Sequence, residues 1–231
     1  VREFFLRSRS QTVVVLMSAT MDLEELMEYF DRKGSSISIR NSAYLVNVVY
    51  LDDISGIIHD TDEVKKLSSQ QLSGVQPSFN TTLAQITCSL ILAIAKHGET
   101  ILVFLPGLQE IAKMMEMLSS QVDKQEFDTH VLHSSIPPED ADLACRDVQS
   151  HRKRVILASS IAESGVTIPT VASVIDSGIT RKPNSEALLG FKSHRDFWCS
   201  QAVAIQRQGR TGRCGPGLPL AVPQISLMQC S

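Results

Sequence analysis

The sequence lacks the patterns that identify several common classes of protein. No apolar run reaches about 18 residues, the length at which a run becomes a candidate membrane span. The five cysteines stand singly, without a CxxC pair, and the six histidines show no HExxH or similar ligand spacing. We therefore expect no membrane partner and no metal site built by this chain alone.

The chain also has little net charge of either sign. Its formal net charge is −3, so no overall basic field would hold nucleic acid, and any nucleic-acid site has to be local. An odd number of cysteines cannot all pair within one chain, and the first residues do not resemble a signal peptide. We expect an intracellular location, nuclear or cytoplasmic. The chain begins with valine, as if inside a helix, which favours a piece of a longer protein.

Hydrophobic residues make up 43% of the 231 positions, which is enough to build a buried core. The β-branched run at 12–17 predicts a buried strand, and apolar residues at helical spacing after Asp22 predict a helix over 21–30. Short alternating strands are predicted at 36–40 and 44–50, and a polar connection follows at 65–78.

From residue 82 onward, helical and strand patterns alternate. Helices are predicted at 82–98, 108–120 and 138–149, and strands at 100–105, 127–133, 154–160 and 171–178. This order predicts an α/β fold with a mostly parallel sheet and helices on both faces. Ligands of such sheets bind at the carboxyl ends of the strands.

Polar loops follow four of the hydrophobic strands. They read SATMD at 18–22, PGLQE at 106–110, HSSIPP at 133–138 and SSIAESGVTIP at 159–169. Helix capping explains any one of these loops taken alone. Together with the arginine cluster QRQGRTGR at 206–213, the loops are better interpreted as parts of one functional site.

In this order and spacing, four stretches resemble motifs of the DEAH-box family of ATP-dependent RNA helicases, in superfamily 2. SATMD resembles motif III, ILVFLPGLQEI at 101–111 motif IV, SSIAESGVTI at 159–168 motif V and QRQGRTGR motif VI. The resemblance runs from about residue 11 to 217 and implies RecA-like domains with ATP and Mg²⁺ in the cleft between them. On that basis we divide the chain into the following expected parts: 1–34, the end of a first RecA-like domain; 35–80, connecting strands and linker; 81–217, the second RecA-like domain; 218–231, an atypical tail.

The resemblance implies roles for the arginine cluster in ATP hydrolysis. Arg210 and Arg213 would act as arginine fingers on the phosphoryl transition state, and Gln206 would position the attacking water or contact the γ-phosphate. Helical periodicity predicts these three side chains close to one face, with Arg207 turned away. A solvated basic face is the alternative.

Other positions would bind nucleotide or RNA by the same resemblance. Gly165 and Thr167 would face the nucleotide, and Gly209 would allow close packing. Four serines would donate hydrogen bonds to RNA phosphates without reading sequence, with helix capping still open for the first two: Ser134, Ser135, Ser159 and Ser160. Two hydroxyl residues of the first loop would couple nucleotide state to domain movement: Ser18 and Thr20.

Three positions depart from the family pattern. Ser160 replaces a usual Asn, Gly165 replaces Ser or Thr, and Cys145 stands where the family has a base-stacking Phe, so nucleotide binding is expected to be weak. The tail has three prolines in PGLPLAVP, and proline disfavours a central strand.

The sequence contains neither a GxxxxGK[ST] phosphate loop nor a DEAH tetrapeptide. In the family both lie on the first RecA-like domain, so an upstream domain would bind most of the ATP and Mg²⁺, and this chain alone is not expected to hydrolyse ATP. Two functions stay open at this point: the second motor domain of an RNA helicase, or a non-catalytic binding or regulatory module derived from one.

Overall fold

The structure is a computed structural model. It describes the following residues: 15–17, 23–30, 34–37, 46–58, 77–123, 125–146, 151–164, 166–183, 194–211 and 218–221. The chain divides into two compact units, Val1–Asn41 and Ser42–Ser231. In the first unit the predicted helix is present as α2, Leu23–Tyr29. Residues 15–17, the described end of the strand predicted at 12–17, are not in a strand, so that prediction is wrong for this part.

The second unit is built on a parallel sheet of five strands. Its strands are β1 Thr100–Phe104, β2 Phe127–Leu132, β3 Lys153–Ala158, β4 Val171–Asp176 and β7 Leu218–Ala221. Their order in the sheet is β2-β3-β1-β4-β7, and every pairing is parallel. The predicted α/β fold with a parallel sheet is therefore confirmed.

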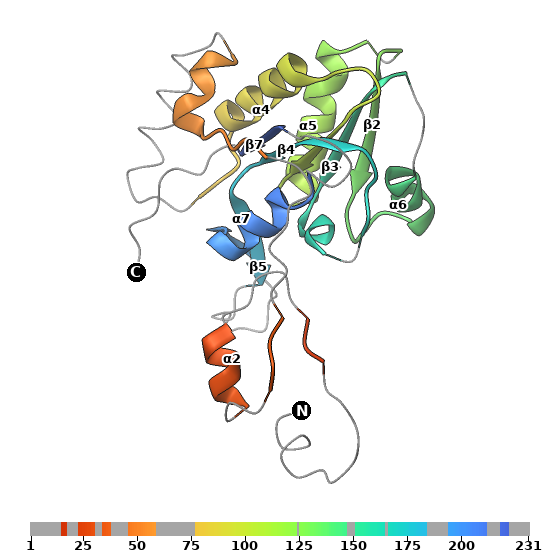
Figure 1. The fold of residues 1–231 in the computed structure, drawn as a ribbon. Helices are drawn as coiled ribbons and strands as arrows, with labels where there is room; N and C mark the ends of the chain where they lie inside the picture. Colours follow the sequence, from red (N-terminus) through yellow and green to blue (C-terminus); the bar gives the residue numbers. More distant parts are fainter. Residues whose placement is uncertain are drawn as a thin grey trace, which may run out of the picture. The chain divides into compact units, whose positions relative to one another are not determined.

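The two faces of the sheet bury separate hydrophobic clusters, because successive side chains of a strand point to opposite faces. Ile101 and Val103 of β1 join the cluster that contains α4, Thr81–Ile94, and α5, Leu108–Gln121. Leu102 and Phe104 join the other cluster, with α6, Pro138–Cys145, and the 3-10 helix η2, Ser160–Glu163. In Figure 1, α4 and α5 lie together while α6 lies apart from them.

Residues 46–58 differ from the predicted strand and linker. Val46 and Val49 form isolated bridges in place of the strand predicted at 44–50, and residues 36–37 of the other predicted strand are not in a strand either. A 3-10 helix, η1 Leu51–Gly56, follows. Leu51 and Ile54 are fully buried in the α4/α5 cluster, so these apolar residues are used in the core of the second unit.

Strand β7 shows how the proline-rich tail is accommodated. Pro219 pairs with Val174 of β4, and β7 lies at the edge of the sheet. Proline has no N–H to donate, and an edge strand leaves one side of its backbone without a ladder partner. The tail begins with a strand, at an edge position that tolerates proline.

Helix α6 is shorter than predicted because a buried arginine takes over its last carbonyl groups. Sequence periodicity predicts helix to 149, but α6 ends at Cys145. Arg154 of β3, 3% exposed, donates hydrogen bonds to the carbonyl oxygens of Leu143 (2.7 Å), Ala144 (3.1 Å) and Arg146 (2.9 Å). These carbonyls are at the helix end, where intrahelical partners run out.

A hairpin that the sequence did not predict follows β4. Strands β5, Ile179–Pro183, and β6, His194–Trp198, pair antiparallel. Their sequences, ITRKP and HRDFW, are mostly charged or polar and lack the alternation of apolar residues that marks a strand.

Arg207 joins α7, Gln201–Gln208, to the sheet and to η2. Its guanidinium is 1% exposed and donates to Asp176 Oδ1 at 2.6 Å and to Glu163 Oε1 at 2.7 and 2.9 Å. It also lies over the ring of Phe104, 5.1 Å from the centroid. Burial alone lowers the pKa of Arg207, but the charges of Asp176 and Glu163 outweigh it, and the pKa is raised overall.

We predict that Arg207→Met lowers the free energy of unfolding by about 3–5 kcal/mol, because it leaves two largely buried carboxylates without their cation. Lys153→Met is the control, because it removes a cation from a more exposed pair with Glu126 and should cost less than about 1 kcal/mol. Urea unfolding followed by circular dichroism measures both. Equal losses for the two variants would contradict the role given to Arg207.

Candidate functional site

An open groove of about 1090 Å³ lies where three neighbouring strands end. Pro106 and Gly107 follow β1, and residues 133–135 and 159–160 follow β2 and β3. The four serines predicted to contact RNA all line this groove: Ser134, Ser135, Ser159 and Ser160. Parallel pairing of β1, β2 and β3 brings the three loops to one edge, as expected from the order of elements.

None of these four serines caps a helix through its side chain. The N-cap of α6 is Pro137, so neither Ser134 nor Ser135 occupies the capping position. Ser159 is the N-cap residue of η2, but its side chain makes no capping hydrogen bond. The capping interpretation that was open for Ser134 and Ser135 is therefore wrong, and their hydroxyl groups border the groove.

The first turn of α5 adds backbone donors to the same groove. Gly107 is the N-cap and has no side chain to satisfy the first amides of the helix, and Leu108 and Gln109 line the groove beside it. The first N–H groups of a helix have no intrahelical acceptor and carry the positive end of the helix dipole. This end of α5 suits a phosphate oxygen.

The other side of the groove is formed by the hairpin, and we call it the hairpin wall. It consists of Arg181, His194, Arg195 and Asp196. The sequence did not point to these residues, because neither β5 nor β6 shows the pattern of a strand. The basic residues Arg181, His194 and Arg195, which follow motif V in the sequence, were the feature that could have indicated a binding surface here.

Arg181 is held by two carboxylates. Its Nη1 and Nη2 donate to the two oxygens of Glu110, at 3.0 and 2.9 Å. Its Nε and Nη2 donate to the two oxygens of Asp196, at 2.7 and 3.0 Å. The hydrogen bonds to Asp196, followed by those to Glu110, raise the pKa of Arg181 against the lowering effect of partial burial.

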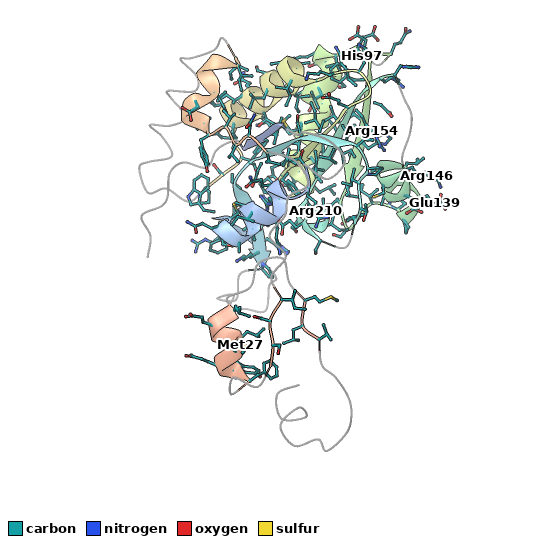
Figure 2. The ribbon with its side chains drawn as sticks, viewed as in Figure 1. Met27, His97, Glu139, Arg146, Arg154 and Arg210 are labelled. Atoms are coloured by element: carbon teal, nitrogen blue, oxygen red, sulfur yellow. The ribbon has the colours of Figure 1, made fainter. Side chains whose placement is uncertain are left out.

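The structure corrects the geometry predicted for motif VI. Helix α7 ends at Gln208, with Gly209 as its C-cap, so Arg210 lies beyond the helix rather than on a shared helical face with Gln206. Arg210, labelled in Figure 2, donates to the carbonyl oxygen of Val166 at 2.8 Å and to that of Glu163. A Cβ placed on Gly209 would meet only carbonyl oxygens of α7 itself, so close packing against another element does not explain this glycine.

The expected nucleotide contacts lie apart from the groove. Gln206 is half-buried on α7 and Thr167 is exposed, and neither they nor Gly209 and Arg210 line the groove. Four of the predicted site residues fall outside the described residues: Ser18, Thr20, Gly165 and Arg213.

Arg207 has a structural role that the sequence did not reveal. It was expected to turn away from the face of Gln206, and the structure buries it against η2 and β4. Glu163 thus accepts hydrogen bonds from Arg207 on its carboxylate and from Arg210 on its backbone carbonyl oxygen. These contacts join motif VI to motif V. Arg207 lies within α7, and nothing in the local sequence distinguishes it from an exposed arginine. Only its burial in the structure shows that it connects motif VI to motif V.

Within the part of the chain that the structure describes, no group of three His, Cys, Asp or Glu side chains is arranged to hold a metal ion. No helix among those same residues is long and apolar enough to cross a membrane.

Comparison with known proteins identifies the family. The model of the helicase conserved C-terminal domain matches residues 82–215. The human ATP-dependent RNA helicase TDRD9 is 32% identical over 241 residues, which cover 92% of this chain and 17% of that protein. The probable ATP-dependent RNA helicase spindle-E of Aedes aegypti is 31% identical over 244 residues, with 94% and 17% covered. The chain therefore spans about a sixth of the length of these curated relatives.

A solved structure supports the same fold. The crystal structure of the DEAH/RHA helicase HrpB from Escherichia coli superposes with a TM-score of 0.68 at 24% identity, over 91% of this chain and 24% of that one. This likeness concerns the fold, and the family rests on the sequence matches. The chain belongs to the helicase conserved C-terminal domain family, as found in the DEAH/RHA RNA helicases.

Proposed function

We propose that the chain is the second motor domain of an ATP-dependent RNA helicase. Its groove binds the sugar-phosphate backbone of single-stranded RNA, or of a strand within structured RNA, without reading sequence. Its motif VI completes an ATP–Mg²⁺ site that an upstream RecA-like domain mostly builds. The observation that carries the proposal is the meeting of four serines and the first turn of α5 in one groove.

The chemistry of the groove favours a phosphate backbone over bases. Hydroxyl groups and helix N–H groups donate hydrogen bonds to phosphate oxygens, and such contacts position a strand without specifying it. Arg195 and His194, both exposed on the hairpin wall, add basic groups on the facing side. Because the whole chain is slightly acidic, these few donors would supply most of the affinity.

The arrangement of motif VI supports a coupling role between the two ligands. Arg207 is fixed by the ion pairs with Glu163 and Asp176, and Thr211 Oγ1 donates to the carbonyls that begin β4, at 2.9 and 3.2 Å. Arg210 lies between these two anchors and against the backbone of the motif V loop. A shift of Arg210 toward a nucleotide phosphate would change its contact with the loop that begins at Ser159.

A non-catalytic binding or regulatory module is the second candidate. Three positions depart from the family pattern, and one of them is Cys145. This residue is half-buried against the hydrophobic cluster that contains Leu102 and Phe104. It offers a thiol where an aromatic ring would stack on adenine. Such a module would keep the RNA groove and lose coupling to ATP.

We predict no ATP turnover by the 231-residue chain, with or without RNA, because the sequence has no phosphate loop and no DEAH carboxylates. A phosphate-release assay with purified protein measures this. Turnover that Arg210→Ala abolishes would contradict the division of labour proposed here.

We predict weak RNA binding that falls steeply with salt and does not differ between unrelated single strands of equal length. Ser159→Ala should weaken it about tenfold, through loss of one hydrogen bond to a charged group. Ser119→Ala, on the exposed side of α5, is the matched control and should have no effect. Fluorescence anisotropy measures all three. Strong preference for one strand would argue against a backbone groove.

We predict that Arg213→Ala, in a longer protein that includes the upstream domain, lowers kcat by about 10³-fold and leaves RNA affinity nearly unchanged, because arginine fingers act on charge that develops in the transition state. Arg213→Lys should not restore turnover, since an ammonium lacks the planar two-pronged donor geometry. Single-turnover hydrolysis and RNA titration measure the two effects. Full ATP turnover by Arg213→Ala would favour the non-catalytic module.

A further inference from the structure

We propose that Arg181 is a positioning residue. It fixes the hairpin wall against the first turn of α5 and so sets the width of the groove, without itself binding phosphate. This inference rests on the proposed RNA groove and names the element that shapes it.

The contacts of Arg181 tie together two segments that are far apart in the sequence. Asp196 is its direct cross-strand partner on β6, and Glu110 belongs to the first turn of α5, 71 residues before it. Each carboxylate receives two hydrogen bonds from the same guanidinium. The paired, planar geometry fixes direction as well as distance, which a single ammonium cannot do.

Gly107 makes room for this contact. A Cβ at this position would lie 2.6 Å from Nη1 of Arg181, closer than such atoms come. The glycine that begins α5 at the groove therefore also admits the arginine from the hairpin. Its backbone is extended, so the requirement is one of space rather than of a left-handed conformation.

Charge argues against Arg181 as a phosphate ligand, although it lines the groove. One cation faces two carboxylates, so the group carries a net charge of −1. The three side chains are only 25%, 13% and 14% exposed for Arg181, Glu110 and Asp196. An RNA phosphate would have to displace a carboxylate to reach this guanidinium, whereas Arg195 is exposed on the same wall.

Glu110→Gln separates the two roles by the sign of its effect. If Arg181 bound phosphate, removing a competing carboxylate would tighten RNA binding. If Arg181 positions the wall, the same change weakens one of its two paired contacts, and we expect RNA affinity to fall about tenfold although the chain has lost a negative charge. Glu116→Gln removes the same charge from an exposed position of the same helix and should leave affinity unchanged.

The fluorescence of Trp198 can test whether the hairpin wall is held in place in the absence of RNA. This residue is the one tryptophan of the chain, it ends β6, and it packs against the α4/α5 cluster. We expect Glu110→Gln and Arg181→Lys to increase acrylamide quenching of its fluorescence and to speed hydrogen exchange at residues 194–198. Lys182→Met, a loss of charge at the exposed neighbour of Arg181, should change neither.

The outcomes separate this inference from the proposed function. A looser wall together with weaker RNA binding supports it. An unchanged wall, or tighter RNA binding by Glu110→Gln, overturns it. A looser wall with unchanged RNA affinity, while Ser159→Ala still binds poorly, overturns the positioning role and leaves the groove intact. If the unaltered chain binds no RNA, the proposed function fails, and quenching and exchange still decide whether Arg181 holds the wall.

Discussion

Parallel pairing of β1, β2 and β3 is the constraint on which the rest of the site depends. In a parallel sheet the chain returns to the same edge after each crossover, so the loops that follow these strands meet there although the first and last lie more than 50 residues apart. Each strand supplies one short polar segment, and no single segment forms a site. The groove exists because Gly107, Ser134 and Ser159 follow neighbouring strands.

Buried or partly buried guanidiniums connect the elements around this sheet. Arg154 caps the end of α6, Arg207 joins α7 to η2 and β4, and Arg181 links the hairpin to α5. Each one satisfies carbonyl or carboxylate groups that would otherwise be costly to bury. An arginine-rich motif in this chain is therefore partly structural. Of the two described arginines of motif VI, Arg207 donates to two carboxylates and to the carbonyl oxygen of Ile179, and Arg210 contacts the motif V backbone.

The sequence was sufficient for the central α/β pattern and for the serines of the groove. The hydrophobic runs at 100–105 and 155–158 contain β-branched residues and are followed by polar loops, so both strands and the residues that follow them could be located. The hairpin could not be located, because ITRKP and HRDFW owe their strand conformation to cross-strand pairs such as Arg181 with Asp196 and not to apolar alternation. The end of α7 was not predicted correctly for a related reason. Helical spacing of the side chains continues past Gly209 in the sequence, but the helical backbone ends at Gln208.

On the basis of the family and the groove, we propose that the carboxyl edge of this sheet binds an RNA backbone. The most direct measurement is hydrogen exchange by mass spectrometry with and without a single-stranded RNA. The account predicts protection at residues 106–109, 133–135 and 159–160, on three different peptides, and none on the exposed side of α5 near Ser119. Protection confined to other surfaces while RNA is bound would contradict it.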